Sequence, residues 1–202
     1  MSVFNDPVAL RRAELPSDTV EMARWLIGKL VVRTTMDGVL SGRIVETEAY
    51  PVGDPASHAY RGQTPRNRAL FLEPGHAYVY IAYGISHLLN VSSEAAGVGG
   101  GVLIRGLEPL DGVEAMQRNR GLLPLRDLTR GPGRLAAALQ VDRSLDGVDL
   151  CQEGPLWLAS DGHTAGPIVT STRIGLTRAA DQLLRFYVPG SPFVSGPKAL
   201  NR

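Results

Sequence analysis

The feature that most constrains the fold is a β-hairpin signal early in the chain. Residues 30–36 are rich in β-branched side chains, Asp37-Gly38 is a typical tight-turn dipeptide, and a second apolar run begins at Val39. This pattern predicts two antiparallel strands, the second of which continues through V-E-T-E-A-Y at residues 45–50.

The second predicted strand has an unusual polar face. Side chains alternate between the two faces of a strand, so Glu46, Glu48 and Tyr50 would share one side. The other side would carry Val45, Thr47 and Ala49. Two like charges on one face repel each other. Either this face meets water, or it holds a catalytic acid beside an aromatic ring, and the stretch alone leaves both interpretations open.

The rest of the chain mixes strands and helices without regular alternation. Further strands are expected at residues 77–83, 87–93, 101–107, 155–159, 168–173 and 183–188, and helices at 20–27, 110–120 and 131–140. Ser17 or Asp18 is a candidate cap for the first helix, and Thr64-Pro65 for a short helical turn through residues 66–70. Residues 51–62 and 95–101 read as loops, the second as a flexible one. This arrangement predicts an α+β fold. With no linker or repeat, we expect one domain over residues 1–202.

Composition favours a soluble protein of a reducing compartment. The one cysteine, Cys151, excludes an internal disulfide. The N-terminal residues lack the order of a signal peptide, and no apolar run is long enough to span a bilayer. We expect a cytoplasmic monomer without membrane contacts, associated with the nucleoid if the source is bacterial.

The cations are almost all arginines, although the net charge is only +1. Nineteen arginines stand against two lysines, Lys29 and Lys198. Arginine binds phosphate in a bidentate manner, but GC-rich coding sequence also favours arginine codons, so both explanations stay open. Those in the middle of the chain are candidates for a shared surface: Arg61, Arg66, Arg68, Arg118, Arg120, Arg126, Arg130 and Arg134.

A second informative stretch is A-Y-V-Y-I-A-Y-G at residues 77–84. Tyr78 and Tyr80 would share a strand face, and Tyr83 would stand at the turn beside Gly84. A ring at a turn either folds back onto its sheet or projects outward. Proteins that extract a base from a duplex insert such a projecting side chain into the gap.

Other site types find little support. The four histidines show no metal-ligand spacing, so we expect no metal and no cofactor. The sequence has no G-x-S-x-G elbow and no phosphate-binding glycine motif between a strand and a helix.

Several motifs, taken in order, carry a family resemblance. They are V-E-T-E-A-Y (45–50), His58, Q-T-P-R-N-R (63–68), A-Y-V-Y-I-A-Y-G (77–84), L-N-V-S-S (89–93), V-L-I-R-G-L-E-P (102–109), R-G-P-G-R-L (130–135) and L-R-F-Y-V-P-G-S-P (184–192). Together they resemble the alkyladenine (3-methyladenine) DNA glycosylase family. The resemblance implies a single domain with a curved, mostly antiparallel sheet and flanking helices, without a helix-hairpin-helix. It also implies excision of alkylated or deaminated purines from duplex DNA in base excision repair.

The resemblance implies roles for individual residues. Glu48 resembles the general base that activates water, and Arg105 the group that orients it. Tyr83 resembles the ring that intercalates into DNA, and a main-chain carbonyl near Ile174 would hold the water. The base pocket would comprise Tyr50, His58, Tyr80 and Asn90. The candidate phosphate contacts are Arg61, Arg66, Arg68, Arg130 and Arg134.

The chemistry of these residue types fits such a reaction. Breaking an N-glycosidic bond builds positive charge on the sugar, which a carboxylate stabilises while it takes a proton from water. Lys29 and Lys198 lie outside every pocket motif, so no amine is expected to form a Schiff base, and a monofunctional enzyme that leaves an abasic site is predicted.

Two alternatives remain at this stage. Carboxylates at i and i+2, about 7 Å apart on a strand, are compatible with an inverting glycoside hydrolase, whereas Glu46 would otherwise be a supporting or solvated residue. A lesion-binding module without turnover is the other. Residues 51–57 and 97–101 depart from the usual family loops, which leaves the ranking of lesion substrates open.

Overall fold

The organising element of the fold is β3 (Gly38–Tyr50), the strand that carries the V-E-T-E-A-Y run. In the computed structural model, which describes residues 6–197 and 201, β2 (Leu30–Thr35) pairs with the first half of β3. On its other edge β3 pairs with β6 (Gly101–Pro109), and β9 (Arg185–Tyr187) pairs with its second half. Three neighbouring strands therefore meet around Glu46 and Glu48.

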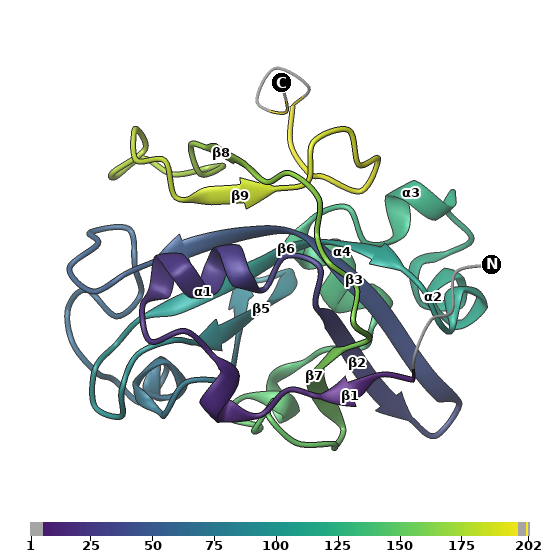
Figure 1. Cartoon of the computed structure of the whole chain (residues 1–202), viewed down its shortest axis with the longest axis horizontal. Helices are drawn as coiled ribbons and strands as arrows, with labels where there is room; N and C mark the ends of the chain where they lie inside the picture. Colours follow the sequence, from purple (N-terminus) through teal and green to yellow (C-terminus); the bar gives the residue numbers. More distant parts are fainter. Residues whose placement is uncertain (1–5, 198–200, 202) are drawn as a thin grey trace.

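The strands form one curved sheet with the helices packed against it (Figure 1). Its order is β1-β7-β2-β3-β6-β5-β4, with β9 beside β3 and β8 beside β9. The remaining strands are β1 (Val8–Ala9), β4 (Ala77–Ala82), β5 (Ser86–Ser92), β7 (Leu156–Ser160) and β8 (Val169–Ser171). Every strand pair in the described part of the chain is antiparallel. The predicted α+β class, with a curved antiparallel sheet in a single compact domain, is confirmed.

The first hairpin forms as predicted, but its turn lies one residue earlier. Thr35 pairs with Gly38, so the two-residue loop is Met36-Asp37 and not Asp37-Gly38. Gly38 begins the return strand with a φ of +118°. Residues other than glycine rarely adopt this backbone conformation. The glycine thus provides the positive φ needed at the first residue of β3 and is not part of the two-residue turn.

A β-bulge at Glu46 changes the predicted faces of β3. The register against β6 shifts on both sides of Glu46. Ile44 and Ala49 both belong to the main core although they are five positions apart, and Val45 packs in a different cluster with Tyr187. Strict alternation would place Ile44 and Ala49 on opposite faces, and a bulge reverses that alternation. The prediction that Val45 shares a face with Ala49 was therefore wrong.

Within the described residues, four short α-helices accompany the sheet. They are α1 (Thr19–Trp25), α2 (Val113–Arg120), α3 (Leu125–Leu128) and α4 (Pro132–Ala138), and the 3-10 turns are η1 (Arg12–Glu14), η2 (Arg68–Phe71) and η3 (Arg143–Leu145). Asp18 caps α1 by accepting from the amides of Val20 and Glu21, each at 2.9 Å. The turn expected from residue 66 starts at Arg68 instead, because the Asn67 side chain accepts from the Thr64 amide at 2.6 Å. None of these described helices is long and apolar enough to cross a membrane.

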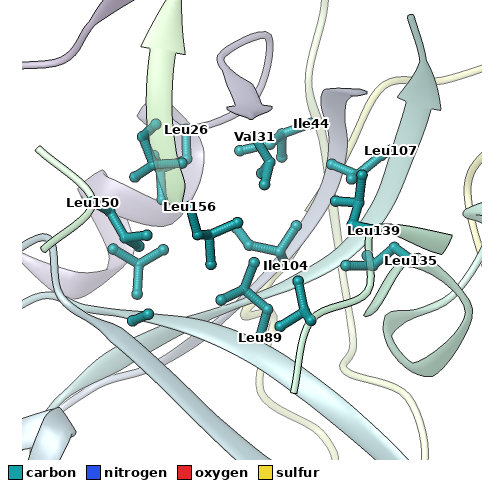
Figure 2. Packing of buried hydrophobic residues seen from close by; sticks show 14 of the residues in the cluster. Leu26, Val31, Ile44, Leu89, Ile104, Leu107, Leu135, Leu139, Leu150 and Leu156 are labelled. Atoms are coloured by element: carbon teal, nitrogen blue, oxygen red, sulfur yellow. The ribbon is translucent and has the colours of Figure 1, made fainter. Parts of the chain in front are cut away.

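One hydrophobic cluster joins the sheet to its helices (Figure 2). Leu26 follows α1, Leu135 lies on α4, and both pack with Ile44 and Ile104 of the sheet. Each such side chain, fully buried, contributes about 1.5–3 kcal/mol. The core therefore fixes β3 and β6 firmly, and these two strands carry Glu48 and Arg105.

The glycine-rich loop at residues 97–101, expected to be flexible, is closely packed over residues 99–101, whereas Gly97 and Val98 are exposed. A side chain at Gly99 would come within 2.5 Å of Phe71 and 2.6 Å of Ala59. The glycines let this loop approach the segment that holds His58. The loop therefore supports one wall of the pocket described next.

Candidate active site

The carboxylate of Glu48 is fully buried beneath a pocket: Tyr50, Arg105 and Ile174, which contact it, line that pocket, whereas Glu48 itself does not. Its Oε1 accepts from the backbone amide of Ile174 at 2.7 Å, and its Oε2 accepts from the Tyr50 hydroxyl at 2.9 Å. Nη1 of Arg105 lies 3.3 Å from the same Oε2. Two hydrogen bonds and one ion pair, from three separate segments, thus hold the carboxylate in one orientation, and the interpretation of this strand face as a solvated one was wrong.

Arg105 lies between the two glutamates of the motif. Its Nε donates to Glu46 Oε1 at 3.3 Å, and its Nη2 to the Ser195 hydroxyl at 3.2 Å. Burial by itself lowers the pKa of Arg105, but Glu48 and Glu46 outweigh it and the pKa is raised overall. Arg105 therefore stays a cation beside the two carboxylates.

Glu46 is occupied by the protein itself. It accepts from Arg185 Nε at 2.6 Å and from the amide and hydroxyl of Ser195 at 2.7 and 3.0 Å, besides the contact with Arg105. The side chain is fully buried. Glu46 is thus a supporting residue and not a solvated one, and of these partners only Arg105 lines the pocket.

Aromatic rings line the pocket above Glu48. The rings of Tyr78 and Tyr80 stack with their centroids 5.3 Å apart, and His58 meets Tyr80 edge-on at 4.5 Å. His58 Nδ1 lies 2.9 Å from the Tyr78 hydroxyl. Because His58 contacts Tyr80 directly, a base can stack between these two rings only if His58 moves.

The protonation states of the rings follow from burial. Burial lowers the pKa of His58, and Arg66 adds to the effect, so the imidazole is neutral near pH 7. Burial also raises the pKa of Tyr78 to about 12. The pKa of Tyr50 is raised first by burial and then by Glu48, so its hydroxyl remains a donor to that carboxylate. The walls are neutral and aromatic, and the floor is charged.

The pocket brings most of the predicted site residues together. It is an open cavity of about 570 Å³. Its lining includes the predicted residues Tyr50, His58, Tyr80, Tyr83, Asn90, Arg105 and Ile174. At Ile174, the backbone amide donates a hydrogen bond to the Glu48 carboxylate. That a main-chain carbonyl near Ile174 holds the attacking water stays a prediction. Asn90 is buried, and its amide nitrogen donates to the Tyr78 carbonyl at 3.1 Å.

Tyr83 projects from the tip of the β4–β5 hairpin. The residue is 92% exposed, and its φ of +51° lies in the left-handed region that non-glycine residues seldom occupy. The alternative in which the ring folds back onto the sheet does not fit this exposure. A free aromatic ring at the rim of the pocket has the geometry that an intercalating side chain needs.

The candidate phosphate contacts divide into two groups. Arg61, Arg66 and Arg68 are exposed, and Arg66 also lines the pocket with its guanidinium carbon 6.0 Å from the Tyr80 ring centre. By contrast, Arg130 Nε donates to the Val194 carbonyl at 2.8 Å, and Arg134 lies 3.3 Å from Asp127. Of these five arginines, Arg66 is the one that lines the pocket.

Three contributors to the site were missed from the sequence. Tyr78 was predicted only to share a strand face with Tyr80, and its stacking on that ring was not foreseen. Ser195 lies outside every motif that the sequence analysis used. The Asp54–Arg173 ion pair joins two loops far apart in the sequence. The described residues contain no group of His, Cys, Asp and Glu side chains that could hold a metal ion.

Fold and site together define a class of enzyme. The α+β domain holds the buried carboxylate of Glu48, paired with Arg105, beneath an aromatic pocket, and this arrangement suits hydrolysis of a glycosyl bond to a flat base. The sequence model of the family described as methylpurine-DNA glycosylase matches residues 13–192. The chain belongs to the methylpurine-DNA glycosylase family, and it is a hydrolase of N-glycosyl bonds.

Curated relatives agree with this assignment. A protein of Mesorhizobium japonicum is 68% identical over 195 residues, covering 96% of this chain and 94% of the relative. One of Paraburkholderia phytofirmans is 53% identical over 191 residues, covering 95% and 90% of the two chains. One of Chlorobium phaeobacteroides is 46% identical, covering 90% and 92%. Each of the three carries the name "putative 3-methyladenine DNA glycosylase".

Proposed function

We propose that the protein flips alkylated or deaminated purines out of duplex DNA and hydrolyses their N-glycosidic bond. The observation that carries this proposal is the buried carboxylate of Glu48, held by Arg105, Tyr50 and the Ile174 amide beneath aromatic walls. A base inside a duplex cannot reach a buried carboxylate, so it has to leave the stack. Tyr83, exposed at the rim, would fill the gap that the base leaves.

In the proposed mechanism, Glu48 takes a proton from a water molecule that attacks the sugar carbon. Its negative charge stabilises the positive charge that develops on the sugar as the base departs. Arg105 and the Ile174 amide keep the carboxylate aligned, because Arg105 forms an ion pair with it at 3.3 Å and the amide donates a hydrogen bond to it. Methylation at N3 or N7 makes a purine cationic, which favours departure, and electron-rich faces of Tyr50 and Tyr80 attract such a cation.

The proposed enzyme is monofunctional. A glycosylase that also cuts the strand forms a Schiff base through an amine. Lys29 has its ammonium 4.7 Å from the Trp25 ring and does not line the pocket, and Lys198 lies outside the described residues. The product would therefore be an abasic site in an intact strand.

The two earlier alternatives are less favoured. An inverting pair needs two carboxylates that flank a water, whereas every described contact of Glu46 is with protein donors. A binding module without turnover would have no need of a carboxylate that three partners hold in place.

The test is base release from duplex oligonucleotides that each carry one lesion: 3-methyladenine, 7-methylguanine, hypoxanthine or ethenoadenine. We expect release of the free base, strand cleavage only after alkali treatment, no borohydride-trapped adduct, and full activity in EDTA. Strand cleavage without alkali, together with a trapped adduct, would contradict the monofunctional mechanism. Release from none of the four duplexes would contradict the proposed substrates.

A further inference from the structure

A buried ion pair lies directly behind one wall of the pocket. The guanidinium carbon of Arg173 lies 4.6 Å from the centre of the Tyr50 ring. Arg173 is buried and does not line the pocket, so the Tyr50 ring separates its charge from the bound base. Arg173 Nη2 donates to Asp54 Oδ1 at 3.1 Å, and Nη1 pairs with Asp54 Oδ2. Asp54 is buried as well.

The remaining contacts of Arg173 fix its position. Its Nη1 also donates to the carbonyl of Ala49, the residue before Tyr50, at 3.0 Å. Its Nε is buried and finds no acceptor within the part of the chain that the structure describes. The next residue, Ile174, donates its amide to Glu48. The guanidinium is thus held against the ring of Tyr50 by Asp54 and the backbone of β3.

A charge behind an aromatic ring changes what the ring attracts on its other face. An aromatic face attracts cations through its quadrupole, and a second cation behind the ring opposes that attraction. Stacked rings have centroids about 4.5 Å or more apart, so a base on Tyr50 would have its centre about 9 Å from the guanidinium carbon. At that distance, within a buried site, an unpaired positive charge repels a cationic base appreciably. It has little effect on a neutral base.

We propose that the Asp54–Arg173 pair sets the preference of the pocket between cationic and neutral bases by fixing the net charge behind Tyr50. The proposal rests on the proposed function, since it concerns the bases released there. Asp54 cancels most of the charge of Arg173 and so keeps Tyr50 attractive to a cationic purine such as 7-methylguanine. Hypoxanthine, which is neutral, is bound through stacking with little dependence on that charge.

The experiment compares the single-turnover rates of release of 7-methylguanine and hypoxanthine, expressed as their ratio, in the wild type and three variants. Asp54→Asn leaves the cation unbalanced, and we expect the ratio to fall by about threefold to tenfold. Arg173→Gln removes the cation, and we expect the ratio to rise by about twofold or more. In the double variant Asp54→Asn/Arg173→Gln no net charge remains, and the ratio should not fall below that of the wild type.

The opposite directions separate this role from a merely structural one. If the pair only held Tyr50 in place, both single variants would slow the two substrates together. A ratio that stays unchanged in Asp54→Asn, or that moves the same way in both single variants, overturns the inference. If Asp54→Asn does not fold, Arg173→Gln alone tests the inference. A ratio of 7-methylguanine to hypoxanthine release in Arg173→Gln that is at or below the wild-type value overturns the inference. Failure of the wild type to release either base would instead overturn the proposed function and this inference with it.

Discussion

At the scale of single residues, the two glutamates of V-E-T-E-A-Y have different roles although they stand on one strand. Both are fully buried. Glu46 accepts from Arg185, Arg105 and Ser195, whereas Glu48 accepts from groups that line the pocket, Tyr50 and Ile174. Arg105 contacts both and so connects the structural carboxylate with the proposed catalytic one.

The first prediction concerns Glu48→Gln, which keeps the shape of the side chain but removes the base and its charge. We expect lesion-DNA binding near that of the wild type and base release slower by about a hundredfold to ten-thousandfold. Single-turnover release, with binding followed by fluorescence anisotropy, measures both quantities. Weak binding together with normal release by the bound fraction would contradict a catalytic role for Glu48.

Glu46→Gln is the matched control on the same strand. It removes the buried carboxylate charge that Arg105 and Arg185 both contact, so we expect a loss of about 3–5 kcal/mol in the free energy of unfolding. Below its melting temperature the folded variant should retain most of its rate of release. Equal catalytic losses in both variants would restore the paired-carboxylate mechanism.

At the scale of secondary-structure elements, the β4–β5 hairpin presents Tyr83 at its tip, and the pairing of Ala82 with Ser86 closes the turn. Tyr83 is almost fully exposed, so its substitution should not disturb the fold. We predict that Tyr83→Ser slows release of hypoxanthine from a well-paired duplex more than from a mispaired one, because a mispaired base costs less to extrude. Single-turnover rates on the two duplexes measure this difference.

The control is Met36→Ser, which removes an exposed apolar side chain from the tip of the other hairpin. It should slow neither duplex. If Tyr83→Ser slows both duplexes equally or leaves both rates unchanged, the ring does not act as an intercalating wedge.

Another element-scale prediction concerns the link between β3 and the segment after β7. Arg43 Nη2 lies 2.7 Å from Asp161 Oδ2, and its Nη1 donates to the Gly28 carbonyl at 3.0 Å. The hydrogen bonds from Arg43 lower the pKa of Asp161 to about 2. Because this pKa is lower in the folded state, the stabilisation is fully present above about pH 4 and is lost as the pH falls towards 2.

Asp161→Asn tests this link. Its free energy of unfolding should be lower than that of the wild type by about 1–2 kcal/mol at pH 7, and the difference should shrink towards pH 2. Urea unfolding across this pH range measures it. Asp37→Asn, at the exposed hairpin turn, should give no difference at any pH. A difference for Asp161→Asn that does not change with pH would show that the ion pair is not its source.

Local signals were sufficient for most elements, and long-range contacts decided the rest. The periodicity of residues 77–83 and 87–93 predicted β4 and β5 closely, because those strands pair with each other across a short turn. The bulge at Glu46 had no local signal, since it depends on the register of β6 against β3. In the same way, the Asp54–Arg173 pair joins residues 119 positions apart, which no short motif can reveal.

At the scale of the whole molecule, the charge is nearly balanced, with a net value of +1. A protein with so little net charge needs a local cluster of cations to bind DNA, because phosphate contacts dominate such affinity. Arg61, Arg66 and Arg68 are exposed on the segment that also carries His58, and Arg66 lines the pocket. Arg130 and Arg134 are engaged by Val194 and Asp127 instead.

The last prediction follows from this division. Arg66→Gln and Arg68→Gln should each weaken binding to duplex DNA and lower the slope of log K against log salt concentration by about 1, because each variant would neutralise one phosphate fewer. Arg134→Gln should change the slope less, because its side chain pairs with Asp127. Arg11→Gln, another exposed arginine that pairs with Glu14, serves as the matched control and should leave the slope unchanged. Fluorescence anisotropy titrations between about 50 and 200 mM salt measure all four slopes. Equal slopes in all four variants would mean that phosphates are bound elsewhere on the molecule, and that these two arginines only flank the pocket.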